Sequence, residues 1–214
     1  MTEGLGQVSF DPGDEADSVA VPGLRHIPGW LDPDACQEML ARIEAGVWST
    51  ELRRRVQHYG HRYDYGRRSV TADARTAADA PPLPPWALQQ AERLAREGIM
   101  DPRADQVIVN EYQPGQGISA HVDCVPCFGP VVAAISLGSG CVMDFTQPED
   151  GRRAGVLLAP GSLCVMTREA RYAWRHGIAA RKSDPDGAGR VPRGRRVSVT
   201  FRTVLVPGSG SGSG

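Results

Sequence analysis

The chain has 214 residues, 41% of them hydrophobic, and a formal net charge of −1 at pH 7. This length supplies one sizeable core, so we expect a single domain. No apolar run approaches the roughly 18 residues of a membrane span, and the N-terminus lacks the apolar segment of a signal peptide, so we expect a soluble cytoplasmic protein with no membrane partner. The odd number of cysteines, five, argues against a disulfide framework in a chain of this size.

Charge is distributed unevenly along the chain. Residues 1–47 carry nine acidic side chains against two arginines, whereas residues 48–68 carry six arginines against two acidic side chains. Residues 168–202 carry ten basic side chains against three acidic ones. The two basic stretches could contact an anionic partner, although solvated surface charge would give the same pattern.

Capping residues and hydrophobic periodicity predict the first secondary-structure elements of the chain. Residues 1–18 are acidic and rich in glycine, which predicts a disordered leader, and residues 19–30 predict a short strand and a turn. Asp32 and Pro33 fit the start of a helix and Gly46 fits its end. The apolar residues between them share one face of that helix: Cys36, Met39, Leu40 and Ile43.

Residues 48–70 differ from the rest of the chain because arginines alternate there with aromatic residues and histidines. Gly60 and Gly66 suggest a hairpin, and we predict that this stretch forms a lid over an anionic substrate. Arginines neutralise phosphates and aromatic rings stack on bases, although an edge hairpin with a solvated basic face is the alternative. The candidates for phosphate contacts are Arg53, Arg54, Arg55, Arg67 and Arg68. The candidates for base stacking are Trp48, Tyr63 and Tyr65.

The second half of the chain predicts a β-rich fold. Residues 71–85 read as a loop, and residues 85–97 read as a second helix that Gly98 ends. Turn residues separate eight further strands: 106–112, 117–123, 131–137, 141–146, 155–159, 163–167, 172–178 and 196–206. This spacing favours two packed antiparallel sheets of jelly-roll type with flanking helices. We therefore predict one domain over 19–206, followed by a Gly/Ser linker over 207–214.

One of these strands carries a candidate metal site. His121 and Asp123 lie two residues apart, so they point to the same side of a strand. Two histidines and one carboxylate form the facial triad that holds Fe(II) and leaves other positions open. Among the five histidines, His176 lies in a late strand and is the one suited to be the third ligand. Cys124 and Cys127 could form half of a zinc site or a redox pair, but without a second pair nearby we favour a packing role.

The last strand carries a candidate site for a dicarboxylate. Arg196, Ser198, Thr200 and Arg202 alternate with apolar residues, so they share one face. Arginine binds carboxylates with two hydrogen bonds, and two arginines on one face could hold the two ends of a small diacid. Asn110 and Tyr112 share a face of another strand and could hydrogen-bond the same ligand.

Four motifs, taken in order, resemble the AlkB family of Fe(II)/2-oxoglutarate-dependent dioxygenases. They are Asn110-Glu111-Tyr112-Gln113-Pro114-Gly115, His121-x-Asp123, His176-Gly177-Ile178 and Arg196-x-Ser198-x-Thr200-Phe201-Arg202. The resemblance covers residues 53–205 and implies a double-stranded β-helix. It also implies that His121, Asp123 and His176 are the catalytic iron ligands, that Arg196 and Arg202 bind the carboxylates of 2-oxoglutarate, and that Asn110 and Tyr112 complete that site. Ser198 stands where the founding AlkB enzyme has asparagine.

The resemblance also implies a reaction. Residues 54–60, with Gly138-Ser139 and residues 142–145, are similar to the AlkB-like domain of tRNA wobble-uridine hydroxylases. This implies hydroxylation of an alkyl group on a nucleobase, either as oxidative demethylation in DNA or RNA repair or as modification of a tRNA base. A base in a duplex must first be flipped out. Two alternatives are a small-molecule hydroxylase that acts on an anionic metabolite and a nucleic-acid-binding module without catalysis. Mixed charge and the lack of a heptad pattern favour a monomer.

Overall fold

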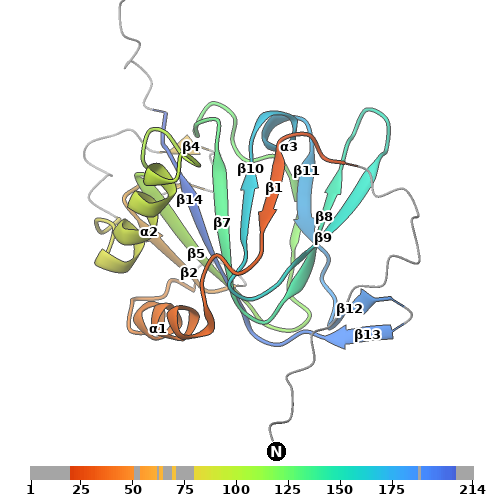
Figure 1. Ribbon diagram of the computed structural model, residues 1–214, viewed down its shortest axis with the longest axis horizontal. Coiled ribbons are helices and arrows are strands. Elements are labelled where there is room, and N and C mark those ends of the chain that lie inside the picture. Colours follow the sequence, from red (N-terminus) through yellow and green to blue (C-terminus); the bar gives the residue numbers. More distant parts are fainter. Residues whose placement is uncertain are drawn as a thin grey trace, which may run out of the picture.

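The computed structural model describes residues 20–50, 54–61, 63–64, 69–70, 80–187 and 189–205. Two antiparallel sheets face each other, and two helices lie on the outer side of the larger sheet (Figure 1). This arrangement confirms the predicted mainly-β fold, a double-stranded β-helix. The predicted leader over 1–18 and the predicted linker over 207–214 lie outside the described residues.

The larger sheet has six strands, with β14 between β7 and β5. In spatial order the strands are β1 (Leu24–Ile27), β10 (Leu163–Met166), β7 (Val132–Gly138), β14 (Arg196–Arg202), β5 (Gln106–Tyr112) and β2 (Val56–Tyr59). The register places Ser198 of β14 opposite Asn110 of β5 and Ser136 of β7. These three polar residues therefore lie on the same face of the sheet.

The smaller sheet has four strands and carries both histidines of the candidate metal site. In spatial order they are β6 (Ile118–His121), β11 (Arg175–Ile178), β8 (Cys141–Thr146) and β9 (Arg153–Leu158). His176 of β11 lies directly opposite His121 of β6. The pairing of these two strands brings together residues that are far apart in the sequence.

Two apolar cores hold the layers together. In the first core, the outer face of the larger sheet packs against α1 (Pro33–Glu44) and α2 (Pro85–Arg96), and Val197, Val199 and Phe201 of β14 belong to it. The second core lies between the sheets and contains Phe145 and Trp174. Because β14 turns its apolar side to the helices, its polar side faces the space between the sheets. The Asp32 carboxylate caps α1, accepting a hydrogen bond of 2.8 Å from the Ala35 N–H.

Most predicted strands are present, but two predictions in the last third of the chain are wrong. The predicted strand 172–178 is preceded by a one-turn helix, α3 (Arg168–Tyr172), and becomes a strand only at Arg175. The segment between the predicted strands 172–178 and 196–206, where no strand is predicted, contains a hairpin formed by β12 (Ser183–Asp186) and β13 (Gly189–Pro192). This hairpin is mostly exposed and has no apolar alternation, so it lacks the pattern from which strands are predicted.

The stretch predicted as a lid has two parts in the structure. Val56–Tyr59 forms β2, which pairs with β5 as the edge strand of the larger sheet. Tyr63–Asp64 (β3) and Ser69–Val70 (β4) form an antiparallel pair, which fits the predicted hairpin. The first part of the predicted lid is thus built into the sheet.

One pair of cysteines differs from the predicted packing role. Cys124 and Cys127 form a disulfide with a Cα–Cα distance of 5.3 Å, so the prediction that these two thiols only pack is wrong. Cys36, Cys141 and Cys164 are free and buried. None of the helices in the described part of the chain has the length and apolar content needed to cross a membrane.

Candidate metal and cosubstrate site

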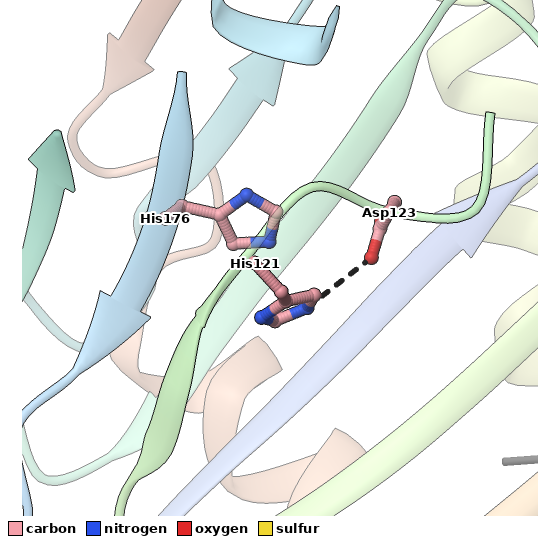
Figure 2. Close-up of side chains that lie close together, drawn as sticks. All are labelled: His121, Asp123 and His176. Carbon is pink, nitrogen blue, oxygen red and sulfur yellow. Dashed lines mark ion pairs between the residues drawn. The ribbon is translucent and has the colours of Figure 1, made fainter. Parts of the chain in front are cut away.

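His121, Asp123 and His176 come together between the two sheets, and one donor atom from each lies within 4.8 Å of the others (Figure 2). His121 ends β6, and Asp123 follows in the turn beyond it. The strand is therefore shorter than predicted, but the two side chains still converge. Gly177 allows β6 and β11 to approach closely, because a Cβ at this position would lie 2.9 Å from the Cα of Ala120.

The histidines are oriented for metal binding. The Nδ1 atom of His121 lies 2.8 Å from the Ser119 carbonyl oxygen, so Nδ1 donates its proton there and Nε2 keeps a free lone pair. That Nε2 lies 3.4 Å from Oδ1 of Asp123. His176 is 7% exposed, and its Nδ1 has no hydrogen-bond partner among the described residues. A buried nitrogen without a partner is costly unless a ligand completes its surroundings.

The protonation states suit a cation. Burial lowers the pKa of His176 to about 4 against the opposing effect of the Asp123 carboxylate, so His176 is neutral at pH 7. Burial alone would raise the pKa of Asp123, but Arg202 and the two histidines hold it below its usual range. A neutral imidazole, a carboxylate and the free Nε2 of His121 give the donor set that Fe(II) takes in a facial triad. The residues present therefore fit Fe(II).

Arg202 pairs with the carboxylate of this cluster. Its Nε donates to Oδ2 of Asp123 at 3.0 Å, and its Nη1 donates to Oε1 of Gln106 at 3.3 Å. Its guanidinium also lies 4.7 Å from the centre of the Phe128 ring. Arg202 thus orients the Asp123 carboxylate of the candidate metal site, and the role of carboxylate clamp that the resemblance implied for Arg202 stays a prediction.

Arg196 is a buried cation without a counter-ion among the described residues. It is 3% exposed, and its Nη2 donates to Oγ of Ser136 at 3.0 Å. Its Nε and Nη1 atoms are buried and have no partner there. An unpaired buried charge is expensive, and a guanidinium is the preferred partner of a carboxylate. Arg196 therefore fits the carboxylate of a dicarboxylate cosubstrate.

The other residues predicted for this site surround Arg196. Its Cζ lies 5.6 Å from the centre of the Tyr112 ring. Ser198 is 7% exposed and lies opposite Asn110 in the register. Arg54, predicted as a phosphate contact, instead donates from Nε to Oδ1 of Asn110 at 2.8 Å. The structure thus brings Arg54 to the cosubstrate face, which sequence reasoning missed.

Two residues predicted to contact substrate lie on the helix side of the larger sheet. Arg55 donates from Nε and Nη2 to the two carboxylate oxygens of Glu111, at 2.5 and 2.8 Å, and also reaches Glu44. Hydrogen bonds from Arg55 and Arg195 lower the pKa of Glu111 to about 2. Trp48 packs against the first core, and the Arg55 guanidinium lies 4.5 Å from the centre of its ring. A phosphate would have to compete with two carboxylates for Arg55.

The remaining substrate candidates are not placed. Arg53, Tyr65, Arg67 and Arg68 lie outside the described residues, and Tyr63 is described only as part of β3.

Sequence reasoning also overlooked Arg171, which is buried and donates hydrogen bonds to the backbone of the turn that carries Asp123. No signal in the sequence marks it, because it falls between the predicted strands 163–167 and 172–178.

Comparisons with known proteins agree with this geometry. The family model described as the 2OG-Fe(II) oxygenase superfamily matches residues 23–202. The chain is 32% identical to the uncharacterized protein L905 of Acanthamoeba polyphaga mimivirus, over 86% of this chain and 85% of that protein. It is 38% identical to the tRNA (carboxymethyluridine(34)-5-O)-methyltransferase ALKBH8 of Macaca fascicularis, over 71% of this chain. The chain covers only 24% of the length of that relative.

Among solved structures, the chain is similar to the one titled "The structure of OsALKBH1". The TM-score is 0.63 at 20% sequence identity, over 86% of this chain and 98% of that one. At this identity the likeness shows a shared fold.

Proposed function

This chain belongs to the 2OG-Fe(II) oxygenase superfamily, and within it to the AlkB-like enzymes; on this basis we propose that it hydroxylates an alkyl group on a nucleobase. It is a dioxygenase that uses Fe(II), 2-oxoglutarate and O2. The observation that carries the proposal is the cluster of His121, Asp123 and His176, of which the last two are buried, in the same inter-sheet space as Arg196, a buried guanidinium without a counter-ion among the described residues.

Each residue of the site has a distinct task. His121, Asp123 and His176 would hold Fe(II), which supplies the activation of O2 that couples decarboxylation of 2-oxoglutarate to oxidation of a C–H bond. Arg196 binds a carboxylate of 2-oxoglutarate, and Ser136 orients the guanidinium through its hydrogen bond. Arg202 keeps the Asp123 carboxylate ionised and aimed at the histidines. Asp123, His176 and Arg196 are buried, which limits the access of water to the cosubstrate.

Two observations support a nucleobase substrate. The relative from Macaca fascicularis is named for an activity on tRNA, and residues 48–70 combine arginines with aromatic residues. If the target carbon is an N-methyl group, its hydroxylated product releases formaldehyde and leaves the unmethylated base. Because the cluster lies between two sheets and its Asp123 and His176 are buried, the base would have to be single-stranded or flipped out.

A small anionic metabolite is the second candidate substrate, and one observation favours it. The described arginines of the predicted lid are engaged within the protein: Arg54 binds Asn110, and Arg55 binds Glu111 and Glu44. These pairs reduce the number of cations offered to a phosphate backbone. A non-catalytic module is not supported, because the metal donor set is complete.

The test is a substrate panel. Anaerobically loaded Fe(II) enzyme is mixed with 2-oxoglutarate and methylated single-stranded DNA, duplex DNA or tRNA, and oxygen is then admitted. Mass spectrometry should detect loss of a methylene or gain of an oxygen atom in one nucleic acid, together with succinate. Asp123→Ala should form no succinate. Succinate formation that no nucleic acid stimulates, but that a small anionic metabolite does, would overturn the nucleobase proposal.

A further inference from the structure

Arg171 is a buried cation whose hydrogen-bond partners are backbone carbonyls. It lies in α3, is 2% exposed, and forms no ion pair with a carboxylate among the described residues. Its guanidinium donates to four carbonyl oxygens, those of Asp123 at 3.0 Å, Cys124 at 3.3 Å, Phe128 at 3.1 Å and Gly129 at 3.2 Å. Carbonyl partners offset part of the cost of burying the charge, so the side chain is fixed by the segment it binds.

These four carbonyls belong to the two ends of one turn. Asp123 and Cys124 begin the segment 123–129, and Phe128 and Gly129 end it. Within the turn, the Phe128 N–H donates to the Cys124 carbonyl at 3.2 Å, and the disulfide joins Cys124 to Cys127. The planar guanidinium has donors on several sides in a fixed geometry, so a single side chain can hold both ends of the turn.

The turn carries one metal ligand, and the helix that carries Arg171 leads to another. The Asp123 carbonyl accepts from Arg171, while its carboxylate accepts from Arg202. Downstream of α3, the chain passes through the buried Trp174 and enters β11, where His176 lies. Arg171 therefore links the backbone of the carboxylate ligand to the element that positions a histidine ligand.

We propose that Arg171 is a positioning residue of the metal centre, which sets the position of Asp123 relative to His176. The proposal rests on the metal site of the proposed function but not on its substrate. A residue with a purely structural role would change the stability of the fold and leave the metal affinity of the folded protein unchanged. Residues that orient metal ligands typically change that affinity by about 10- to 100-fold.

The test measures metal binding without cosubstrate. Mn(II) is titrated anaerobically into the unchanged chain, Arg171→Lys and the control Arg168→Lys, which replaces an exposed arginine of the same short helix. Lysine keeps the charge, but its single ammonium cannot reach both ends of the turn. Arg171→Lys should weaken Mn(II) binding by about 10- to 100-fold while retaining the near-UV circular dichroism of a folded protein. Arg168→Lys should bind within about twofold of the unchanged chain.

Mn(II) affinity of folded Arg171→Lys within about twofold of the unchanged chain would overturn the proposal, whatever its thermal stability. If Arg171→Lys does not fold, amide hydrogen exchange measured on the unchanged chain, with and without Mn(II), tests the proposal instead. Because Arg171 joins the two segments, Mn(II) should slow amide exchange in both 123–129 and 168–172. Slowing in 123–129 alone would contradict the link. Neither readout requires 2-oxoglutarate or a nucleic acid, so a failure here is distinct from a failure of the proposed substrate.

Discussion

Two buried arginines, Arg193 and Arg196, lie close together in sequence near the start of β14 and differ in what they bind. Arg193 donates to both carboxylate oxygens of Asp184, at 2.5 and 2.6 Å, and to the Ala179 carbonyl at 2.7 Å. Arg196 has one hydrogen-bond partner, Ser136, and two buried nitrogens without a partner among the described residues. Since both are at most 9% exposed, burial alone does not separate them.

The difference lies in whether the fold itself supplies the counter-ion. Asp184 and Arg193 belong to the β12–β13 hairpin and the segment after it, so their ion pair closes that hairpin onto the protein. Arg196 points into the space between the sheets, where the described residues offer it a hydroxyl but no carboxylate. A buried charge that the fold satisfies is part of the structure, whereas one that the fold leaves unsatisfied marks a site for a ligand.

The largest expected effect is the loss of stability when the ion pair between Arg193 and Asp184 is broken. Arg193→Met leaves Asp184 with the partly exposed Arg181 and a backbone hydrogen bond from Val142, and breaking a buried pair costs about 3–5 kcal/mol. Urea unfolding should show this loss, whereas Val191→Thr, an exposed change on the same hairpin, should cost less than about 0.5 kcal/mol. A loss below about 1 kcal/mol for Arg193→Met would remove the distinction between the two arginines.

His176, like Arg196, is a buried group whose polar atoms the described part of the fold does not fully satisfy, and it predicts that the stability of the protein depends on pH. Its pKa in the folded protein is about 4, compared with about 6.5 in an unfolded chain, so the unfolded state binds more protons between these values. Stability of the metal-free protein should therefore be full above about pH 6.5 and should fall, by on the order of 3 kcal/mol, as the pH drops toward 4. His176→Leu should flatten this part of the stability profile, measured by urea unfolding at several pH values. An equal slope in both proteins would show that His176 does not titrate in this way.

A smaller effect is expected at Ser198. Asparagine would place an amide on the inner face of β14, opposite Asn110, where it could add one hydrogen bond to the cosubstrate. One such bond contributes about 0.5–1.5 kcal/mol, so Ser198→Asn should tighten binding of 2-oxoglutarate to the Mn(II)-loaded protein by a few-fold at most. Calorimetric titration gives the comparison, with Ser198→Ala as the control that removes the hydroxyl. Weaker binding by Ser198→Asn would show that the buried site has no room for the longer side chain.

The smallest expected effect is the change in the free energy of unfolding when Arg196, the buried arginine without a counter-ion among the described residues, is replaced. Arg196→Met removes a buried guanidinium and loses only the hydrogen bond to Ser136, so the cosubstrate-free protein should keep its stability within about 1 kcal/mol or gain some. Urea unfolding measures this directly. A loss as large as that of Arg193→Met would mean that Arg196 is also a structural residue.

The sequence predicted the elements whose pattern is local. The alternation in 196–202 predicted both the strand and its polar face, and the segments 106–112 and 141–146 were predicted with the bounds that β5 and β8 have. The metal cluster was predicted because His-x-Asp leaves few candidates for a third ligand. These successes depend on periodicity and on a short list of chemically suitable residues.

The features that sequence reasoning missed depend on partners far along the chain. Arg171 meets Asp123 across 48 residues, and Arg55 meets Glu111 across 56. Helix α3 has five residues, too few to form without tertiary contacts, and the β12–β13 hairpin is held by a buried ion pair rather than by an apolar face. A single sequence does not show which polar side chains will face each other across a sheet or a turn.

The central claim is that Arg196 binds a carboxylate of 2-oxoglutarate, and one measurement tests it most directly. Calorimetry compares 2-oxoglutarate binding to the anaerobic Mn(II)-loaded unchanged chain and to Arg196→Met, after both are shown to be folded and to bind Mn(II) equally. Removing one partner of a buried charge-assisted pair costs about 2–5 kcal/mol, so affinity should fall by about 100-fold or more. Equal affinity in the two proteins would contradict the account.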